Sequence, residues 1–157
     1  MEQKKALQSE RRPTAVSVRP PRPSDAGVLA SLAGELGYPT DPETLLGRLA
    51  ALHPADAAVM VATDATDAPI GWCHVELRRS LVAPLSALVA GLVITAAHRS
   101  SGIGAELLDA AERWARERNC ARLVVATRVT RERAHRFYLR EGYEIAKTSH
   151  LFEKRLD

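Results

Sequence analysis

Cysteine is scarce in this sequence, and its two cysteines follow no pattern typical of a disulfide framework or a metal site. Cys73 and Cys120 form no Cys-x-x-Cys pair and have no histidine cluster nearby. A disulfide-stabilised scaffold and a cysteine-based zinc site are therefore excluded. Long apolar runs are also missing, because the longest uncharged stretch, 81–97, contains Pro84 and is shorter than the ~20 apolar residues of a membrane-spanning helix. We expect neither a metal nor a membrane partner.

Targeting signals and a strong charge of one sign are absent as well. Residues 1–12 are polar and charged and lack the apolar segment of a secretory signal peptide, so we expect a cytoplasmic protein. Lys and Arg exceed Asp and Glu by only 22 to 19, and the basic residues are scattered along the chain. This pattern argues against a nucleic-acid partner, and a basic nucleic-acid-binding module is the weakest of the functions that we leave open.

The residues that are present form an ordinary globular composition. Apolar residues make up 46% and charged residues 26% of the 157 residues, a length that corresponds to about one hydrophobic core. We expect a disordered leader over 1–13 and a single domain over 14–157.

Hydrophobic periodicity predicts a series of strands and helices. Strands are expected at 16–18, 57–62, 70–77, 85–95, 123–126, 143–146 and 149–154. Helices are expected at 24–36, at 41–52, after Gly104, and from a cap at Thr130 to Gly142. The short turn between the second and third strands indicates antiparallel pairing. This order predicts an α/β protein with a mixed sheet flanked by helices.

A glycine-rich loop lies between the strand at 85–95 and the most amphipathic helix. Gly102 and Gly104 let backbone N–H groups approach a ligand, and the helix N-terminus adds unpaired donors and a partial positive charge. Arg99 adds a full charge, so the loop suits a phosphate or pyrophosphate. A flexible turn without a ligand is the alternative. A dinucleotide-binding loop would need a third glycine where Leu107 stands, and the Gly-Lys-Ser/Thr of a nucleotide P-loop is missing.

Two motifs together resemble the GNAT-type N-acetyltransferases. Arg99-Ser-Ser-Gly102-Ile-Gly104 is similar to the Arg/Gln-x-x-Gly-x-Gly/Ala signature of that family, and it stands between a strand and a helix as the family requires. The second motif, Ala134-His-Arg-Phe-Tyr138-Leu-Arg-Glu-Gly142-Tyr143, resembles the family's later helix with its aromatic-tyrosine pair. The resemblance covers roughly residues 15–155 and implies a mostly antiparallel sheet that is splayed at the cofactor site.

The resemblance implies transfer of an acetyl group from acetyl-CoA to a primary amine of a small molecule or protein, without a metal. Main-chain groups of Leu92, Val93 and Ile94 are expected to pair with the pantetheine arm. The pyrophosphate is expected on the loop from Arg99 into the helix, that is Arg99, Ser100, Ser101, Gly102, Ile103, Gly104 and Ala105. A small-molecule amine is the favoured acceptor, and a homodimer is left open.

Tyr138 matches the family's tyrosine, which faces the CoA sulfur. Its ordinary pKa near 10 keeps the phenol protonated at neutral pH, so it can donate a proton to the leaving thiolate. Packing of the helix on the sheet is the alternative role.

The sequence departs from the family pattern at two places. No carboxylate stands at 88–91, where the family often has one; the nearest candidate base is Glu76, with His74 or a water chain as alternatives. Arg131 stands where the family has an asparagine, and it could reach a CoA phosphate. The missing base favours a catalytically silent acyl-CoA-binding or regulatory domain as the second hypothesis. Three carboxylates of the first helices are candidates for holding a cationic amine, namely Asp25, Glu35 and Asp41.

Overall fold

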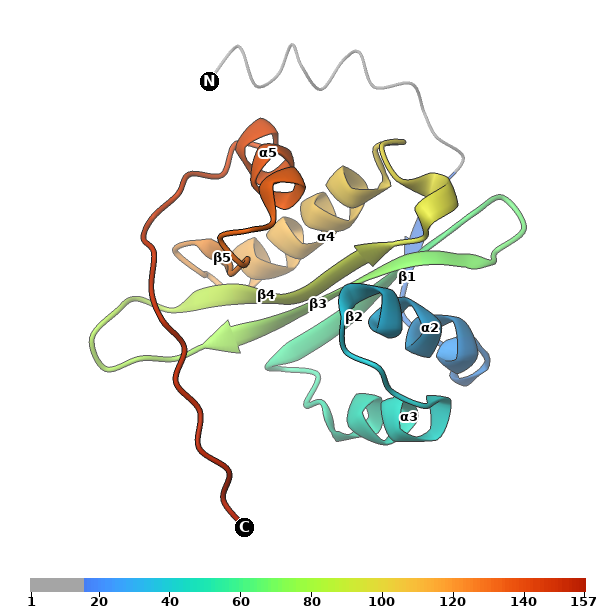
Figure 1. Cartoon of the computed structure of the whole chain (residues 1–157), viewed down its shortest axis with the longest axis horizontal. Helices are drawn as coiled ribbons and strands as arrows, with labels where there is room; N and C mark the ends of the chain where they lie inside the picture. Colours follow the sequence, from blue (N-terminus) through green and yellow to red (C-terminus); the bar gives the residue numbers. More distant parts are fainter. Residues whose placement is uncertain (1–15) are drawn as a thin grey trace. The chain divides into compact units, whose positions relative to one another are not determined.

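The computed structural model describes residues 16–157, which form two compact units. The first unit ends at Val125 and contains the sheet with helices α2, α3 and α4; the second, Ala126–Asp157, contains helix α5 (Figure 1). The expected leader over 1–13 lies outside the described residues. The single domain over 14–157 stays a prediction.

The first unit is built on a five-stranded sheet in the order β1-β2-β3-β4-β5. Its strands are β1 (Ser17–Arg19), β2 (Ala57–Thr63), β3 (Pro69–Arg78), β4 (Ser86–Ile94) and β5 (Leu123–Val125). Consecutive strands pair antiparallel from β1 to β4, whereas β4 and β5 pair parallel. Parallel neighbours need a crossover, and helix α4 (Ile103–Glu117) provides it. The expected mixed, mostly antiparallel sheet is confirmed.

Each face of the sheet is covered by a different helix. The indole N–H of Trp72 on β3 donates to the carbonyl oxygen of Leu29 at 3.3 Å, so α2 (Ala26–Leu36) covers the face that carries Trp72. Cys73 and Val75 point to the opposite face, because side chains alternate along a strand, and both are fully buried there. Helix α4 packs on this second face against β2, β3 and β4 (Figure 1).

The helices of the first unit begin and end close to the predicted residues. Residues Pro23–Asp25 form a short 3-10 turn, η1, so α2 begins at Ala26, slightly later than expected. It ends at Leu36 and is capped by Gly37, whose φ of 102° favours glycine. Helix α3 (Pro42–Ala51) begins after Asp41, whose carboxylate accepts from the Thr44 N–H at 2.8 Å.

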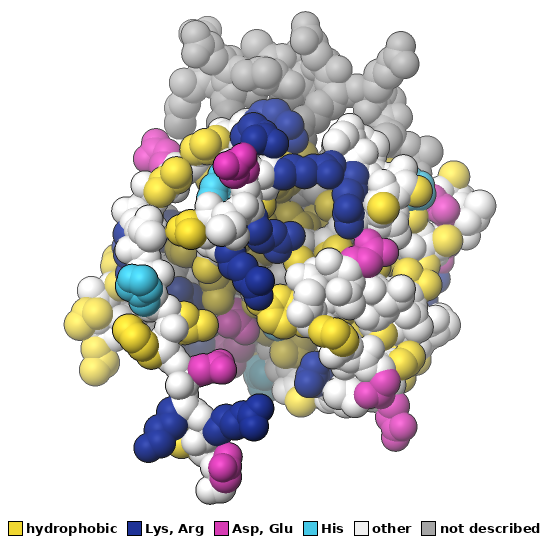
Figure 2. Space-filling view, in the orientation of Figure 1, with side chains coloured by type: hydrophobic (Ala, Val, Ile, Leu, Met, Phe, Trp, Pro, Cys, Tyr) yellow, Lys and Arg dark blue, Asp and Glu magenta, His cyan; other side chains and the backbone are white. Residues whose placement is uncertain are grey.

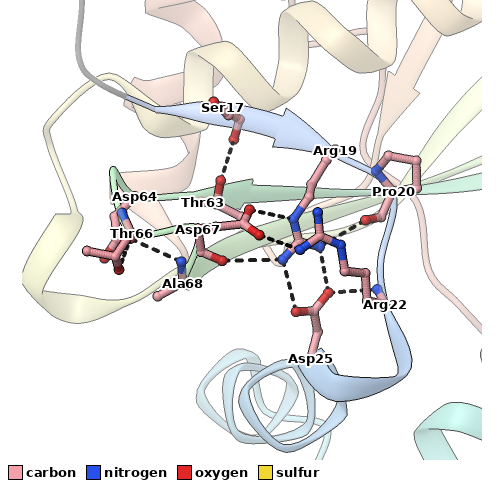
Figure 3. Close-up of polar contacts among 10 residues, drawn as sticks. All are labelled: Ser17, Arg19, Pro20, Arg22, Asp25, Thr63, Asp64, Thr66, Asp67 and Ala68. Atoms are coloured by element: carbon pink, nitrogen blue, oxygen red, sulfur yellow. Dashed lines mark hydrogen bonds and ion pairs between the residues drawn. The ribbon is translucent and has the colours of Figure 1, made fainter.

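A network of ion pairs joins β1 to the start of α2 and to the turn between β2 and β3 (Figure 3). Arg19 donates to both carboxylate oxygens of Asp25, at 2.8 and 3.0 Å, and through Nε to Asp67 at 2.8 Å. Arg22 also pairs with Asp67, and its backbone N–H donates to Asp25 at 2.7 Å. The side chain of Asp25 is only 4% exposed. The network therefore fixes three segments of the first unit around one buried carboxylate.

The second unit departs from two expectations. The cap expected at Thr130 is wrong: Arg131 is the N-cap residue of α5 (Glu132–Arg140), and it makes no side-chain cap hydrogen bond. Thr130 belongs instead to the preceding turn, which the Arg131 N–H closes onto the carbonyl of Arg128 at 3.0 Å. The end of the helix near Gly142, with φ of 89°, is as predicted.

The strands expected at 143–146 and 149–154 are also wrong. Residues 143–157 contain no strand, and the side chains of Leu151 and Phe152 are exposed. Alternation of apolar and polar residues identifies the face of a strand but specifies no partner for it, and a strand needs neighbours to be stable in water.

Candidate active site

The glycine loop leads directly into the N-terminus of α4, as predicted. Strand β4 is followed by the short 3-10 helix η2 (Ala96–His98), and Gly102 is the N-cap residue of α4 with φ of 89°. The side chain of Ser101 donates to the carbonyl of His98, which holds the loop in a tight turn. The Glu106 N–H bonds to the Gly102 carbonyl at 3.2 Å, whereas the N–H groups of 103–105 precede the first intrahelical hydrogen bond. Three backbone donors are therefore available at this end of the helix.

Open space lies beside Gly102. A Cβ atom built on this residue would meet no heavy atom within 4 Å, although its positive φ makes any other residue strained. The loop thus combines free donors, the positive end of a helix dipole and room for a ligand. These features fit the pyrophosphate group expected from the sequence.

Arg99 lies at the start of this loop and contacts α2. Its Nη2 donates to Glu35 at 3.2 Å, and its Nε donates to the carbonyl of Ile94 at 3.3 Å. Both charged side chains are about two-fifths exposed, so a diffusing anion has access to the guanidinium. The contact joins the predicted cofactor loop to α2, which the sequence did not indicate.

Strand β4 changes its pairing in the middle. It pairs with β5 only from Ala87 to Val89, and its ladder with β3 shifts register because His74 pairs with Gly91 while Val75 pairs with Val89. Ala90 is therefore the extra residue of a β-bulge. Among residues 16–157 no strand pairs with the other edge of 90–94, which includes the predicted pantetheine-binding residues Leu92, Val93 and Ile94. Main-chain groups along this edge can pair with an extended ligand, except that the carbonyl of Ile94 already accepts from Arg99 Nε.

Trp72 packs tightly against the strand at this bulge. A Cβ atom on Gly91 would lie 2.7 Å from the Trp72 ring, so only glycine fits there. The Trp72 N–H bond to Leu29 fixes the ring from the α2 side. The indole therefore connects α2 to the part of β4 where pairing with β5 has ended.

His74 and Glu76 follow Trp72 on the same face of β3. The Nε2 atom of His74 lies 3.9 Å from a carboxylate oxygen of Glu76, too far for a hydrogen bond. This nitrogen is buried and has no hydrogen-bond partner among residues 16–157. Burial lowers the pKa of His74, and the charge of Glu76 partly counteracts that change. The imidazole is therefore neutral at neutral pH.

The three carboxylates considered for binding a cationic acceptor are each engaged within the first unit. Asp25 is bonded to Arg19, Asp41 caps α3, and Glu35 pairs with Arg99. Hydrogen bonds from Arg19 hold the pKa of Asp25 below its ordinary value, and those from Thr44 do the same for Asp41. Within the described part of the chain, the contact given for Glu76 is the one with the neutral His74.

Neither cysteine is suited to form an acyl-enzyme. Cys73 is fully buried, and burial raises the pKa of its thiol to about 12. Burial also raises the pKa of Cys120 above its ordinary value. Because the thiolate is the nucleophilic form, both thiols are poor nucleophiles at neutral pH.

Tyr138 and Arg131 belong to the second unit. The Tyr138 ring packs edge-on against Phe137 and Tyr143, with centroids 5.1 and 5.6 Å apart. Arg131 stands at the start of α5, and the ring of His135 shares a hydrogen bond with the carbonyl of Arg128 at 3.0 Å. His135 therefore stabilises the turn before α5.

Sequence reasoning missed three features of the site: the bulge at Ala90, the Arg99–Glu35 contact and the shielded nitrogen of His74. Gly91 was the available signal for the bulge, since glycine inside a strand pattern often marks one. The other two features depend on the packing of α2 and on burial, for which the local sequence carries no signal.

The fold and this loop are those of an acyltransferase of the class that the motifs resemble. Residues 29–143 match the Acetyltransferase (GNAT) family, and the chain belongs to this family. It is 31% identical over 137 residues to an aminoglycoside N(6')-acetyltransferase type 1 of Stenotrophomonas maltophilia, with 83% of this chain and 88% of that protein covered. It is 34% identical over 124 residues to the uncharacterized N-acetyltransferase YhdJ of Bacillus subtilis (strain 168), with 78% and 86% covered.

Solved structures of acetyltransferases share the fold. An aminoglycoside antibiotic 6'-N-acetyltransferase from Acinetobacter baumannii superimposes with a TM-score of 0.78 at 18% identity, over 90% of this chain and 99% of that one. AAC(6')-Iy in complex with the bisubstrate analog CoA-S-monomethyl-acetylneamine gives 0.76, also at 18% identity and with the same coverage. The GNAT-like fold expected from the sequence is confirmed.

Residues 16–157 contain neither a membrane-spanning helix nor a metal-binding cluster. No helix in this range is both long and apolar enough to cross a membrane. No group of three His, Cys, Asp or Glu residues in the same range could hold a metal ion. Lys and Arg side chains are interspersed with acidic and apolar ones on the face drawn in Figure 2.

Proposed function

We propose that this protein transfers the acetyl group of acetyl-CoA directly to a primary amine of a small molecule. The observation that carries this proposal is the open N-terminus of α4 beside Gly102, next to an edge of β4 that has no strand partner from Ala90 onward. A diphosphate followed by an extended amide-bearing arm is the kind of ligand that uses both features.

The residues proposed to bind acetyl-CoA are those expected from the sequence, and the geometry of β4 and of the glycine loop supports the part of the set that lies in the first unit. The main chain of Leu92, Val93 and Ile94 would bind the pantetheine arm. The loop would bind the pyrophosphate through Arg99, Ser100, Ser101, Gly102, Ile103, Gly104 and Ala105. Bound acetyl-CoA supplies the activated acyl group.

Arg131 is assigned to a phosphate of the cofactor. Arg131→Ala should then weaken binding of CoA more than binding of dephospho-CoA. Equal losses of affinity for the two ligands would refute the assignment.

Direct transfer is favoured because the two thiols are poor nucleophiles at neutral pH. The acceptor amine then attacks the acetyl group without an acyl-enzyme. Two proton transfers accompany this attack, one from the amine and one to the leaving sulfur. Tyr138 is assigned as the donor of a proton to the leaving sulfur, and Glu76, half exposed on β3, as the residue that assists removal of a proton from the amine.

The acceptor class is suggested by the relatives. An aminoglycoside acetyltransferase of Stenotrophomonas maltophilia shares 31% identity over most of both chains, so amino sugars are the first acceptors to test.

A cytoplasmic location and a homodimer are also part of the proposal. Cell fractionation tests the location, and light scattering of the purified chain tests the oligomeric state.

The deciding experiment is an acceptor screen. Purified protein is incubated with acetyl-CoA and a panel of amino sugars, polyamines and amino acids, and free thiol and the mass of the amine are measured. We expect thiol release that depends on the amine, together with a product heavier by one acetyl group. Thiol release without an acetylated product would overturn the proposal.

A catalytically silent acyl-CoA-binding domain is the second candidate, favoured by the absence of a carboxylate at 88–91. The same experiment separates the two when binding is measured in parallel. Saturable binding of acetyl-CoA without turnover of any amine would support the silent domain, whereas turnover excludes it.

A further inference from the structure

His74 stands at the point of the sheet where β4 departs from regular pairing. It pairs with Gly91 next to the bulge, so its neighbour on β4 has no side chain. Its neighbour on β2 is Val59, and Trp72 and Glu76 precede and follow it on the same face of β3. The neighbouring positions in the sheet are therefore apolar or without a side chain, apart from Glu76.

The Nε2 atom of His74 is buried without a partner among residues 16–157. A buried polar atom that lacks a hydrogen bond is unfavourable, and such atoms commonly accept a water or a ligand group. The side chain as a whole is 25% exposed, so solvent reaches other atoms of the ring, and a small polar donor must enter beside them to meet Nε2. Nε2 can therefore accept a hydrogen bond from such a donor when the neutral ring carries its proton on Nδ1.

Few charges act on this imidazole. Neighbouring positions on β2 and β4 carry Val59, Ala57, Gly91 and Leu88, none of which titrates. On the α2 side, Glu35 is paired with Arg99. Glu76 is the one charge within the described residues that alters the titration of His74. Burial keeps the ring neutral at rest, and Glu76 stabilises it once it is protonated.

We propose that His74 Nε2 accepts the proton that the acceptor amine loses during acetyl transfer, with Glu76 stabilising the resulting imidazolium. This role rests on the proposed function and changes the part played by Glu76 from base to charge partner. In the step, the lone pair of the amine nitrogen forms the C–N bond and the C–S bond breaks with its electron pair on sulfur. The nitrogen's proton goes to Nε2, and the sulfur takes a proton from the phenol of Tyr138. Water then returns Tyr138 and His74 to their resting forms.

Glu76 is the weaker choice for the base itself. Its side chain is 42% exposed to solvent, whereas the histidine nitrogen is buried and has no partner in the described part of the chain. A neutral imidazole takes up a proton without first losing a hydration shell.

Kinetics of three variants test the proposal with one accepted amine. His74→Gln keeps a polar group but cannot titrate, and we expect it to lower kcat by about 100-fold or more. Glu76→Gln should lower kcat less. His53→Gln, a substitution of an exposed histidine just after α3, is the matched control and should leave kcat unchanged. Added imidazole should restore part of the activity of His74→Ala, which a purely structural role would not allow.

The pH dependence supplies a second readout. Wild-type kcat should fall as pH drops through the pKa of His74, below its ordinary 6.5, since the protonated ring accepts no proton. Glu76→Gln should shift this fall to lower pH, and His74→Gln should remove it. Ionisation of the amine is common to all variants and cancels in the ratios of their rates.

A third readout needs no turnover. Titration of the His74 ring by NMR in the resting protein should give a pKa below 6.5 that decreases further in Glu76→Gln. Wild-type activity combined with an unchanged His74→Gln rate, or with a ring that titrates at its ordinary pKa, would overturn the role of His74 alone. A wild-type protein that acetylates no amine would overturn both this role and the proposed function.

Discussion

Tyr138 carries a single group that can take part in proton transfer, its phenol. The ring itself is fixed by edge-on contacts with Phe137 and Tyr143. Because phenylalanine preserves these ring contacts, Tyr138→Phe isolates the chemical contribution of the hydroxyl.

We expect Tyr138→Phe to lower kcat by about 10²- to 10⁴-fold, or about 2.7 to 5.4 kcal/mol of barrier, while the affinity for acetyl-CoA changes little. Tyr38→Phe is the matched control, because Tyr38 is 64% exposed and precedes α3. Steady-state kinetics with calorimetric binding measures both quantities. A near-normal kcat with chemistry rate-limiting would show that Tyr138 is not the acid.

Single residues of the site can be predicted from the sequence where the local backbone geometry requires a particular residue type. Gly102 is an example, since its positive φ favours glycine. Arg99 was found from its motif, but its partner Glu35 lies 64 residues away and is invisible to local patterns. The buried nitrogen of His74 likewise follows from tertiary packing.

At the N-terminus of α4, several backbone N–H groups lie next to the same open space. The proposed cofactor site therefore depends on the whole end of the helix and not on one side chain. A side chain at Gly102 would occupy that space and would also strain the loop. Gly47, in the middle of α3, has similar open space around it and an ordinary helical φ, and it offers a matched control.

We expect Gly102→Val to weaken CoA by about 10- to 100-fold, which corresponds to losing roughly one charge-assisted hydrogen bond. Gly47→Ala should leave CoA affinity unchanged and should stabilise the fold by about 0.5 to 1 kcal/mol. Calorimetry with CoA and thermal unfolding of both variants measure these effects. Wild-type affinity in a folded Gly102→Val protein would remove the loop from the proposed cofactor site.

Elements with strong internal signals were predictable from the sequence. Helix α4 has a wide apolar stripe, and the hairpin of β2 and β3 has a turn in which Asp64 accepts from the N–H groups of Thr66 and Ala68. The expected strands after α5 fail because their alternation identifies no partner. The bulge at Ala90 was missed since a register shift depends on two strands at once.

At the scale of the whole first unit, the Arg19 network links segments that are distant in sequence. Arg19 and Asp67 are 48 residues apart, so no local pattern predicts their contact. Strand β1 is only three residues long, and the network adds a second connection between it and the rest of the unit. Hydrogen bonds from Arg19 hold the pKa of Asp25 below its ordinary value of 3.8.

A carboxylate with a depressed pKa stabilises the folded state above the ordinary pKa of 3.8, and that contribution is lost as pH falls through the lower folded value. We expect Asp25→Asn to lower the free energy of unfolding by about 1.5 to 3 kcal/mol at neutral pH, because a charged acceptor is removed from a buried site. The gap between wild type and variant should shrink on acidification below about pH 4. Urea unfolding at a series of pH values measures this gap in the free energy of unfolding.

Asp67→Asn is the control, at an exposed position whose φ of 65° asparagine tolerates, and it should change stability much less. A gap that is absent at neutral pH, or that persists undiminished in acid, would mean that the charge of Asp25 does not stabilise the fold.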